Sequence, residues 1–253
     1  MIQSKDQRHR LDVLLVERGL VETRARARAL ILARQISVDN EIESKAGAQI
    51  SLDAHITLIE PQHPYVGRGG IKLAHALDRF DVEISGQTVL DIGASTGGFT
   101  DVMLRRGAAH VIALDVGRGQ LDWKLRVNPH VTTIEGTNAR YLTRDSLPTG
   151  GQRVNIVTLD VSFISLRLIL PVIPDLLIPD GSIIALVKPQ FEASRREIGK
   201  GGVVRDPKIH TRVIKEVTTA ANALGFTRVA TTPSPILGAA GNREFFMHLR
   251  KRN

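Results

Sequence analysis

Short apolar runs alternate with longer amphipathic stretches through the last two thirds of the chain. A helical pattern covers 208–224, and such alternation implies crossover connections over a mostly parallel sheet. We therefore predict a doubly wound, mostly parallel, seven-stranded Rossmann-like α/β sheet in this part of the chain. The expected strands are 88–92, 111–114, 131–134, 156–159, 183–187, 227–232 and 244–249.

The first sixty residues carry a different pattern. Leu11, Leu14 and Leu15 recur at the spacing of one helix face, and Gly19 ends that run. Thr23 is a suitable N-cap for a second helix. The pattern predicts a small N-terminal α+β domain. Its expected strands are 36–40, which runs into a turn, and 54–59.

Proline and glycine separate these two patterns. Pro61 and Pro64 break secondary structure, and two further glycines follow Gly67 within three residues. A chain of 253 residues is long enough for one large and one small domain. The predicted organisation is a domain over 1–62, a linker over 63–70 and a second domain over 71–253.

The net charge of +8 and a pI near 10.2 favour polyanionic partners. The N-terminal sixty residues are neutral overall, with nine basic and nine acidic side chains. An RNA-binding role for them therefore depends on how the basic side chains cluster, and not on net charge. Arginines crowd the second helix, and the order of elements over 8–60 resembles an αL-type RNA-binding domain. A solvated helix face is the alternative. The candidate RNA-binding residues of this region are Arg24, Arg26, Arg28 and Arg34.

The chain contains no cysteine, which excludes disulfides, thiolate nucleophiles and cysteine-ligated metals. No metal site is expected. The N-terminus has no apolar leader, and no apolar run approaches the length of a membrane span. These absences favour a cytoplasmic protein without membrane insertion.

A turn of small residues follows the first strand of the predicted sheet. Such residues let the backbone turn sharply, and the next helix offers free N–H groups to an anionic moiety, so a nucleotide-like cofactor is expected. Ser95 replaces a glycine of the dinucleotide fingerprint. Asp115 would accept from ribose hydroxyls of either NAD or S-adenosylmethionine, and Asn138 would contact an adenine or cap a turn.

Three segments, 67–73, 91–100 and 159–165, together resemble the TlyA, or haemolysin A-like, family. The resemblance spans nearly the whole chain. It implies an RNA-binding domain joined to an FtsJ-type domain that uses S-adenosylmethionine to methylate a ribose 2′-hydroxyl of ribosomal RNA, free or in a ribosomal subunit. By motif match, the donor pocket would contain Asp91, Gly93, Ala94, Ser95, Thr96, Gly97, Gly98, Phe99, Asp115 and Asn138.

FtsJ-like enzymes use a Lys-Asp-Lys-Glu tetrad, and the matching residues here are Lys72, Asp160, Lys188 and Glu244. The last three adjoin predicted strand ends, and Lys72 lies in a helix after the glycines, so all four can meet at the carboxyl edge of the sheet. A ribose hydroxyl must be oriented and deprotonated. Lys188 is the candidate base, with steering as its alternative role; surface ion pairing is the alternative for the whole tetrad.

Other methyltransferase chemistries fit this sequence poorly. The residues after the fourth strand lack the Asp/Asn-Pro-Pro-aromatic motif of enzymes that methylate exocyclic amines, and covalent or radical mechanisms need cysteines. Basic residues in the glycine-bearing segment 190–205 predict a mobile phosphate-gripping lid or a solvated loop. The further RNA-binding candidates are Arg68, Arg195 and Arg196.

Two functions of other classes compete with RNA methylation. One is a non-catalytic RNA-binding or ribosome-assembly factor that retains the pocket. The other is a membrane-active haemolysin, which the absence of an apolar span disfavours.

Overall fold

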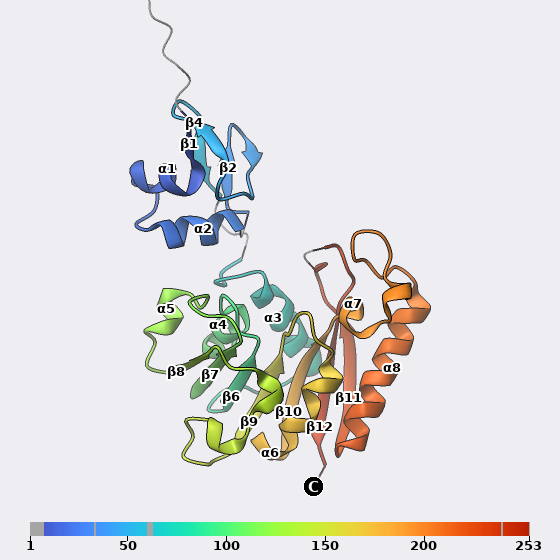
Figure 1. The fold of residues 1–253 in the computed structure, drawn as a ribbon. Coiled ribbons are helices and arrows are strands. Elements are labelled where there is room, and N and C mark those ends of the chain that lie inside the picture. The colour runs from blue at the N-terminus through green and yellow to red at the C-terminus, as the bar shows by residue number, and fades with distance from the viewer. Residues whose placement is uncertain (1–7, 33, 60–62, 239, 253) are drawn as a thin grey trace, which may run out of the picture. The chain divides into compact units, whose positions relative to one another are not determined.

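The computed structural model describes residues 8–32, 34–59, 63–238 and 240–252 (Figure 1). Its contacts divide the chain into two compact units, 1–64 and 65–253. Pro61, part of the predicted boundary, lies outside the described residues. Tyr65 to Arg68, placed in a linker by the sequence, belong to the second unit, and Gly69 already begins a helix.

The first unit is a small α+β domain, as the sequence predicts. Its helices α1 and α2 pack on two short sheets through a core that includes Leu11, Leu15, Ile31 and Ile36. The predicted cap is present, because the Arg26 amide donates to Thr23 Oγ1 at 3.1 Å. The elements are β1 (Arg8–Arg10), α1 (Leu11–Glu17), α2 (Arg24–Leu32), β2 (Ile36–Val38), β3 (Glu41–Ile42), β4 (Gln49–Ser51) and β5 (Ile56–Leu58).

The second unit is the predicted doubly wound sheet, which is confirmed. Its strand order is β11-β12-β10-β9-β6-β7-β8, with only β12 antiparallel to its neighbours. The strands are β6 (Thr88–Ile92), β7 (His110–Asp115), β8 (Val131–Glu135), β9 (Val154–Leu159), β10 (Leu177–Val187), β11 (Phe226–Pro233) and β12 (Phe245–Lys251). The α-helices are α3 (Gly69–Phe80), α4 (Gly98–Arg105), α5 (Trp123–Arg126), α6 (Ile173–Leu176), α7 (Pro189–Glu192) and α8 (Pro207–Ala223).

The central strands β6, β7 and β9 are buried on both faces, which explains why they read as nearly continuous apolar runs. Successive residues point to opposite faces. Val89 therefore packs with α3 and α4, whereas Leu90 packs with α8 and the helical turns after β9. The two hydrophobic cores fix the sheet as the middle layer (Figure 1).

The chain order reverses beside β6. The strands β7 and β8 extend the sheet on one side of β6, and β9 and β10 extend it on the other. In open α/β sheets, ligands bind outside the carboxyl ends of the strands at such a switch point. Short 3₁₀ turns also occur in the connections of this unit, at Ala139–Tyr141, Arg144–Ser146, Leu166–Leu168, Leu170–Val172 and Arg195–Glu197.

Candidate active site

The glycine turn connects β6 to α4 at the switch point. Gly93 has a φ of 87°, and a Cβ atom there would lie 2.5 Å from the carbonyl oxygen of Asp160. Only glycine allows this close approach. The Asp160 amide also donates to the carbonyl of Ile92 at 3.0 Å. The turn and the end of β9 therefore lie in direct contact.

Asp91 is buried beneath this turn and does not line its surface. The side chain is fully buried and accepts from Thr100 Oγ1 at 2.6 Å and from Thr158 Oγ1 at 2.8 Å. Burial raises the pKa of Asp91 to about 6, against the opposing effect of these hydrogen bonds. Asp91 thus anchors the first turn of α4 to β6 and β9.

Asp115 faces the turn from the end of β7. Its Oδ2 accepts from the Ser95 amide at 2.8 Å, and its Oδ1 accepts from the Gly117 amide at 2.7 Å. Ser95 and Thr96 are exposed at the tip of the turn. Ser95 Oγ also donates to Gln120 Oε1 at 3.2 Å. The carboxylate thus joins the loops that follow β6 and β7.

Other predicted pocket residues have different environments. Phe99 is buried in the core, 6.0 Å from the ring of Phe246. Asn138 is exposed and accepts from the Arg140 amide at 3.0 Å, which is the turn-capping role that the sequence left open. The remaining residues of the turn, Ala94, Gly97 and Gly98, are buried.

The start of α3 packs against the glycine turn. A Cβ atom on Gly98 would lie 3.0 Å from the Gly70 amide nitrogen. One helical turn is enough to bring Lys72 to the sheet rim, where its Nζ lies 2.6 Å from Glu244 Oε2. The two side chains are 12% and 3% exposed, so this ion pair is largely shielded from water.

A second ion pair lies at the same rim. Lys188 Nζ is 2.7 Å from Asp160 Oδ1 and donates to Ser162 Oγ at 2.9 Å. Val187 of β10 pairs with Phe245 of β12, so the next position places Lys188 beside Glu244. The structure thus brings the four predicted tetrad residues to one edge of the sheet as two lysine–carboxylate pairs.

An open groove of about 630 Å³ adjoins Lys188. Phe163 lies on it with 92% of its surface exposed and a φ of 63°, a strained conformation for an aromatic residue. The Phe191 ring is 5.2 Å from the Phe163 ring and 5.9 Å from Lys188 Nζ. Arg140 and Arg195 also line the groove. Sequence reasoning missed this aromatic pair, although Phe163 lies inside a segment that carries the family resemblance.

The arginines of the first unit surround a buried carboxylate. Asp12 is fully buried and binds the guanidinium groups of Arg10, Arg24 and Arg28 at 2.9 to 3.0 Å. These hydrogen bonds, Arg10 first, hold the pKa of Asp12 well below its usual range. About half of each guanidinium-bearing side chain remains exposed. Two further predicted residues, Arg26 and Arg34, are exposed as well.

The basic segment after α7, for which the sequence predicts a mobile lid or a solvated loop, has side-chain contacts at several points. Glu197 pairs with Arg212 of α8 at 2.6 Å, and Asn242 donates to the Gly202 carbonyl at 2.9 Å. Arg195 and Arg196 remain exposed on this anchored segment. Elsewhere on the unit, the Arg68 guanidinium donates to the Leu237 carbonyl at 3.4 Å.

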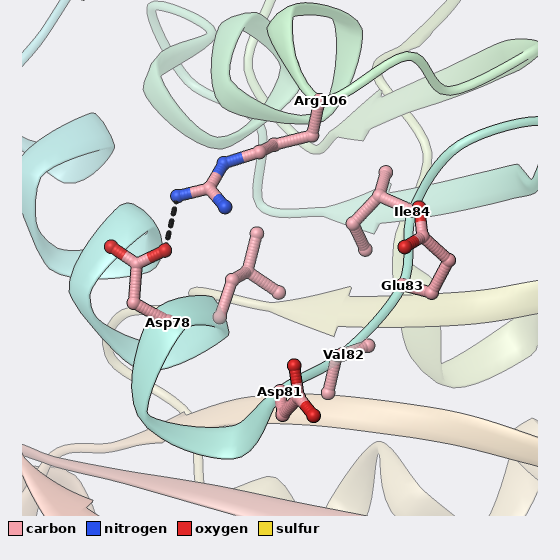
Figure 2. A pocket seen from close by; sticks show the side chains of 7 residues that line it. Asp78, Asp81, Val82, Glu83, Ile84 and Arg106 are labelled. Atoms are coloured by element: carbon pink, nitrogen blue, oxygen red, sulfur yellow. Dashed lines mark hydrogen bonds and ion pairs between the residues drawn. The ribbon is translucent and has the colours of Figure 1, made fainter.

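A separate hollow of about 400 Å³ lies between the end of α3 and the start of β6, at the amino end of that strand (Figure 2). Asp78, Asp81 and Glu83 line it, and Arg106 pairs with Asp78 at 2.5 Å. It contains none of the predicted site residues. Among the residues that the structure describes, no helix is long and apolar enough to cross a membrane.

Known proteins match both units. The family model of FtsJ-like methyltransferases matches residues 65–251, and that of the S4 domain matches 9–56. YqxC of Bacillus subtilis is 47% identical over 96% of this chain and 86% of that protein. The 16S/23S rRNA (cytidine-2′-O)-methyltransferase TlyA of Mycobacterium tuberculosis is 43% identical over 96% and 90%. A solved hemolysin-like protein from Streptococcus thermophilus has a TM-score of 0.76 and 42% identity, covering 98% and 90%.

Proposed function

The chain belongs to the TlyA family of FtsJ-like methyltransferases, and from this premise we propose that it transfers a methyl group from S-adenosylmethionine to a ribose 2′-hydroxyl of ribosomal RNA. One observation carries the proposal. Two lysine–carboxylate pairs, Lys188–Asp160 and Lys72–Glu244, meet at the sheet rim beside a glycine turn.

The residues around the turn fit the proposed methyl donor. A carboxylate has about four acceptor positions, and Asp115 uses one on each oxygen for a backbone amide, so it can also accept from ribose hydroxyls. Ser95 and Thr96 present exposed polar groups beside it. The amino end of α4 offers N–H groups to the carboxylate of the donor's methionine moiety. When bound, the donor supplies a methyl group on a positively charged sulfur.

The tetrad would act on the ribose hydroxyl. Lys188 donates to the hydroxyl oxygen and aims it at the methyl group. As the oxygen–carbon bond forms, the methyl–sulfur bond would break and leave a neutral thioether, and the hydroxyl proton would pass to the Lys188–Asp160 pair. The pair gains one proton, whether Asp160 takes it directly or the amine takes it after giving its own proton to Asp160. Lys72 and Glu244 support the adjoining rim and balance its charge.

The groove beside Lys188 would hold the acceptor nucleotide. An exposed aromatic face stacks on a base, and RNA sites are commonly read as splayed-out bases with phosphates bound by arginines. Phe163 and Phe191 provide the aromatic faces, and Arg140 and Arg195 provide the charges. The S4 domain, with its arginines around Asp12, would bind neighbouring RNA by its backbone.

Replacing Phe163 by alanine is expected to lower kcat/KM for the RNA about tenfold, because one base-stacking contact is worth about 1–3 kcal/mol. The side chain is 92% exposed, so its loss leaves the core intact. Steady-state kinetics measure kcat/KM for the RNA, and calorimetric titration of the methyl donor shows whether donor binding has changed as well. Val229→Ala, which removes a second exposed apolar side chain, on β11, is the matched control. An unchanged kcat/KM for Phe163→Ala would contradict the proposal that a base stacks in this groove.

Incubation of the purified protein with ribosomal subunits or their RNA and isotope-labelled S-adenosylmethionine tests the proposed function. Nuclease digestion and mass spectrometry should yield a labelled 2′-O-methylnucleoside. Donor binding without methyl transfer would favour a ribosome-assembly factor instead. Leakage of dye-loaded vesicles would favour a membrane-active haemolysin.

A further inference from the structure

Glu192 ends α7 with its side chain buried at 6% exposure, and the chemistry proposed above does not use it. Its Oε2 accepts from Ser165 Oγ at 2.5 Å, and its Oε1 accepts from the Leu166 amide at 2.6 Å. Arg167 approaches the carboxylate from the exposed side, with its Nε 3.4 Å from Oε2. A single side chain thus connects α7 to the segment after β9.

The two connected segments carry the reactive groups. Asp160 and Phe163 lie on the segment after β9, and Lys188 and Phe191 lie on the segment after β10. The last backbone pairing between these strands joins Ala185 to Leu159, so both segments extend beyond the sheet ladder. Backbone bonds hold each segment where it leaves the sheet, through the Asp160 amide and the Val187–Phe245 pairing, and side-chain contacts connect the two segments to each other beyond those points.

The conformation of the segment after β9 also needs a tether. Phe163 has a φ of 63°, which a non-glycine residue keeps only when surrounding contacts impose it. The hydrogen bonds from Glu192 reach the chain two and three residues later, at Ser165 and Leu166. They fix the far end of the strained turn while Ser162, bound to Lys188, fixes the near end.

We propose that Glu192 is a positioning residue for methyl transfer, which holds the Asp160 and Lys188 segments in register for the reaction. This inference rests on the proposed function. Burial raises the pKa of Glu192, so the site favours a neutral side chain more than water does. The two hydrogen bonds, more than the negative charge, carry the role.

Comparing Glu192→Gln with Glu192→Ala separates the effect of the hydrogen bonds on kcat from the effect of the negative charge. In Glu192→Gln the amide oxygen can accept from the Leu166 amide, and the NH₂ group can donate to Ser165 Oγ if it displaces Arg167 Nε, one of the two present donors to that oxygen. We expect this variant to keep kcat within about threefold of the wild type, whereas Glu192→Ala loses about 30-fold, since small displacements of reacting groups are costly. The KM for RNA and the Kd for the methyl donor should each change less than about threefold in both variants.

Two further variants complete the experiment. Ser165→Ala removes one of the two hydrogen bonds to Glu192 without changing a core residue. It should lower kcat about fivefold. Glu216→Gln alters the other carboxylate near Arg167, on the surface of α8, and should leave kcat unchanged. If Glu192→Ala does not fold, as judged by circular dichroism, Ser165→Ala and Glu192→Gln decide the question.

Wild-type kcat in a folded Glu192→Ala, or in Ser165→Ala if the former does not fold, overturns the positioning role. Equal losses in Glu192→Gln and Glu192→Ala would also overturn it, because charge would then matter more than the bonds. Failure of the wild-type protein to methylate ribosomal RNA is a distinct result, which contradicts the proposed function itself.

Discussion

Replacing Lys188 by methionine is expected to lower kcat at least about 1000-fold, because the ribose hydroxyl loses both its orientation and its route for the proton. Methionine keeps the length and much of the apolar packing of lysine. Asp160, left without its partner, is 22% exposed and can be hydrated, so the domain should still fold. Single-turnover methylation and calorimetric titration of S-adenosylmethionine measure the two effects, and donor affinity should stay within about twofold.

Lys215→Met is the matched control for this variant, since Lys215 is exposed on α8 away from the sheet rim. Lys188→Arg distinguishes steering from proton uptake. Arginine keeps the charge and the hydrogen bonds but stays protonated in proteins. Substantial activity in Lys188→Arg assigns the lysine to steering. Wild-type rates in Lys188→Met would remove it from the chemistry altogether.

The fold follows from the sequence largely because the central strands of the sheet are buried on both faces. Buried strands give unbroken apolar runs, and the seven expected runs match the seven strands of the sheet to within a few residues, except that β10 begins earlier, at Leu177. The tetrad residues adjoin strand ends or follow the glycines, so the topology alone brings them to one edge. The strands β1, β3 and β4 were missed, because each carries at most one apolar residue, whereas β2 and β5 alternate apolar and polar residues.

Side-chain environments were less predictable than the positions of elements. Asp91 and Phe99 stand in the glycine motif, yet both are buried beneath the turn. A motif records which residues occur together, whereas burial depends on packing: Asp91 lies in a strand that is covered on both faces, and Phe99 lies on the side of α4 that packs on the sheet. Asp12 lies beside Leu11 at the start of α1, and only the fold shows that three arginines neutralise it.

The exposure of Phe163 is also a property of tertiary structure. Large apolar residues in a sequence are expected to be buried, whereas Phe163 is 92% exposed and has a φ of 63°. The hydrogen bonds that hold Ser162 and Ser165 are made with Lys188 and Glu192, which are distant from them in sequence. Local patterns carry no information on such contacts.

Replacing Glu244 by alanine should destabilise the protein by about 3 kcal/mol, since it leaves the Lys72 ammonium buried without a counter-charge. For a unit of this size the loss corresponds to a fall in Tm of about 9 °C, measurable by calorimetry. We also expect kcat to fall about 100-fold, because the rim beside Lys188 loses its charge balance.

The double variant Lys72→Met/Glu244→Leu separates stability from catalysis. Replacing a buried ion pair by apolar side chains of similar size is often neutral for stability, so the Tm should return to within about 3 °C of the wild type. Activity should stay about 100-fold low, because the apolar pair restores packing but not charge. Recovery of kcat together with Tm would show that the Lys72–Glu244 pair only supports the fold. A low Tm in the double variant would instead contradict the assignment of the instability to an unpaired ammonium.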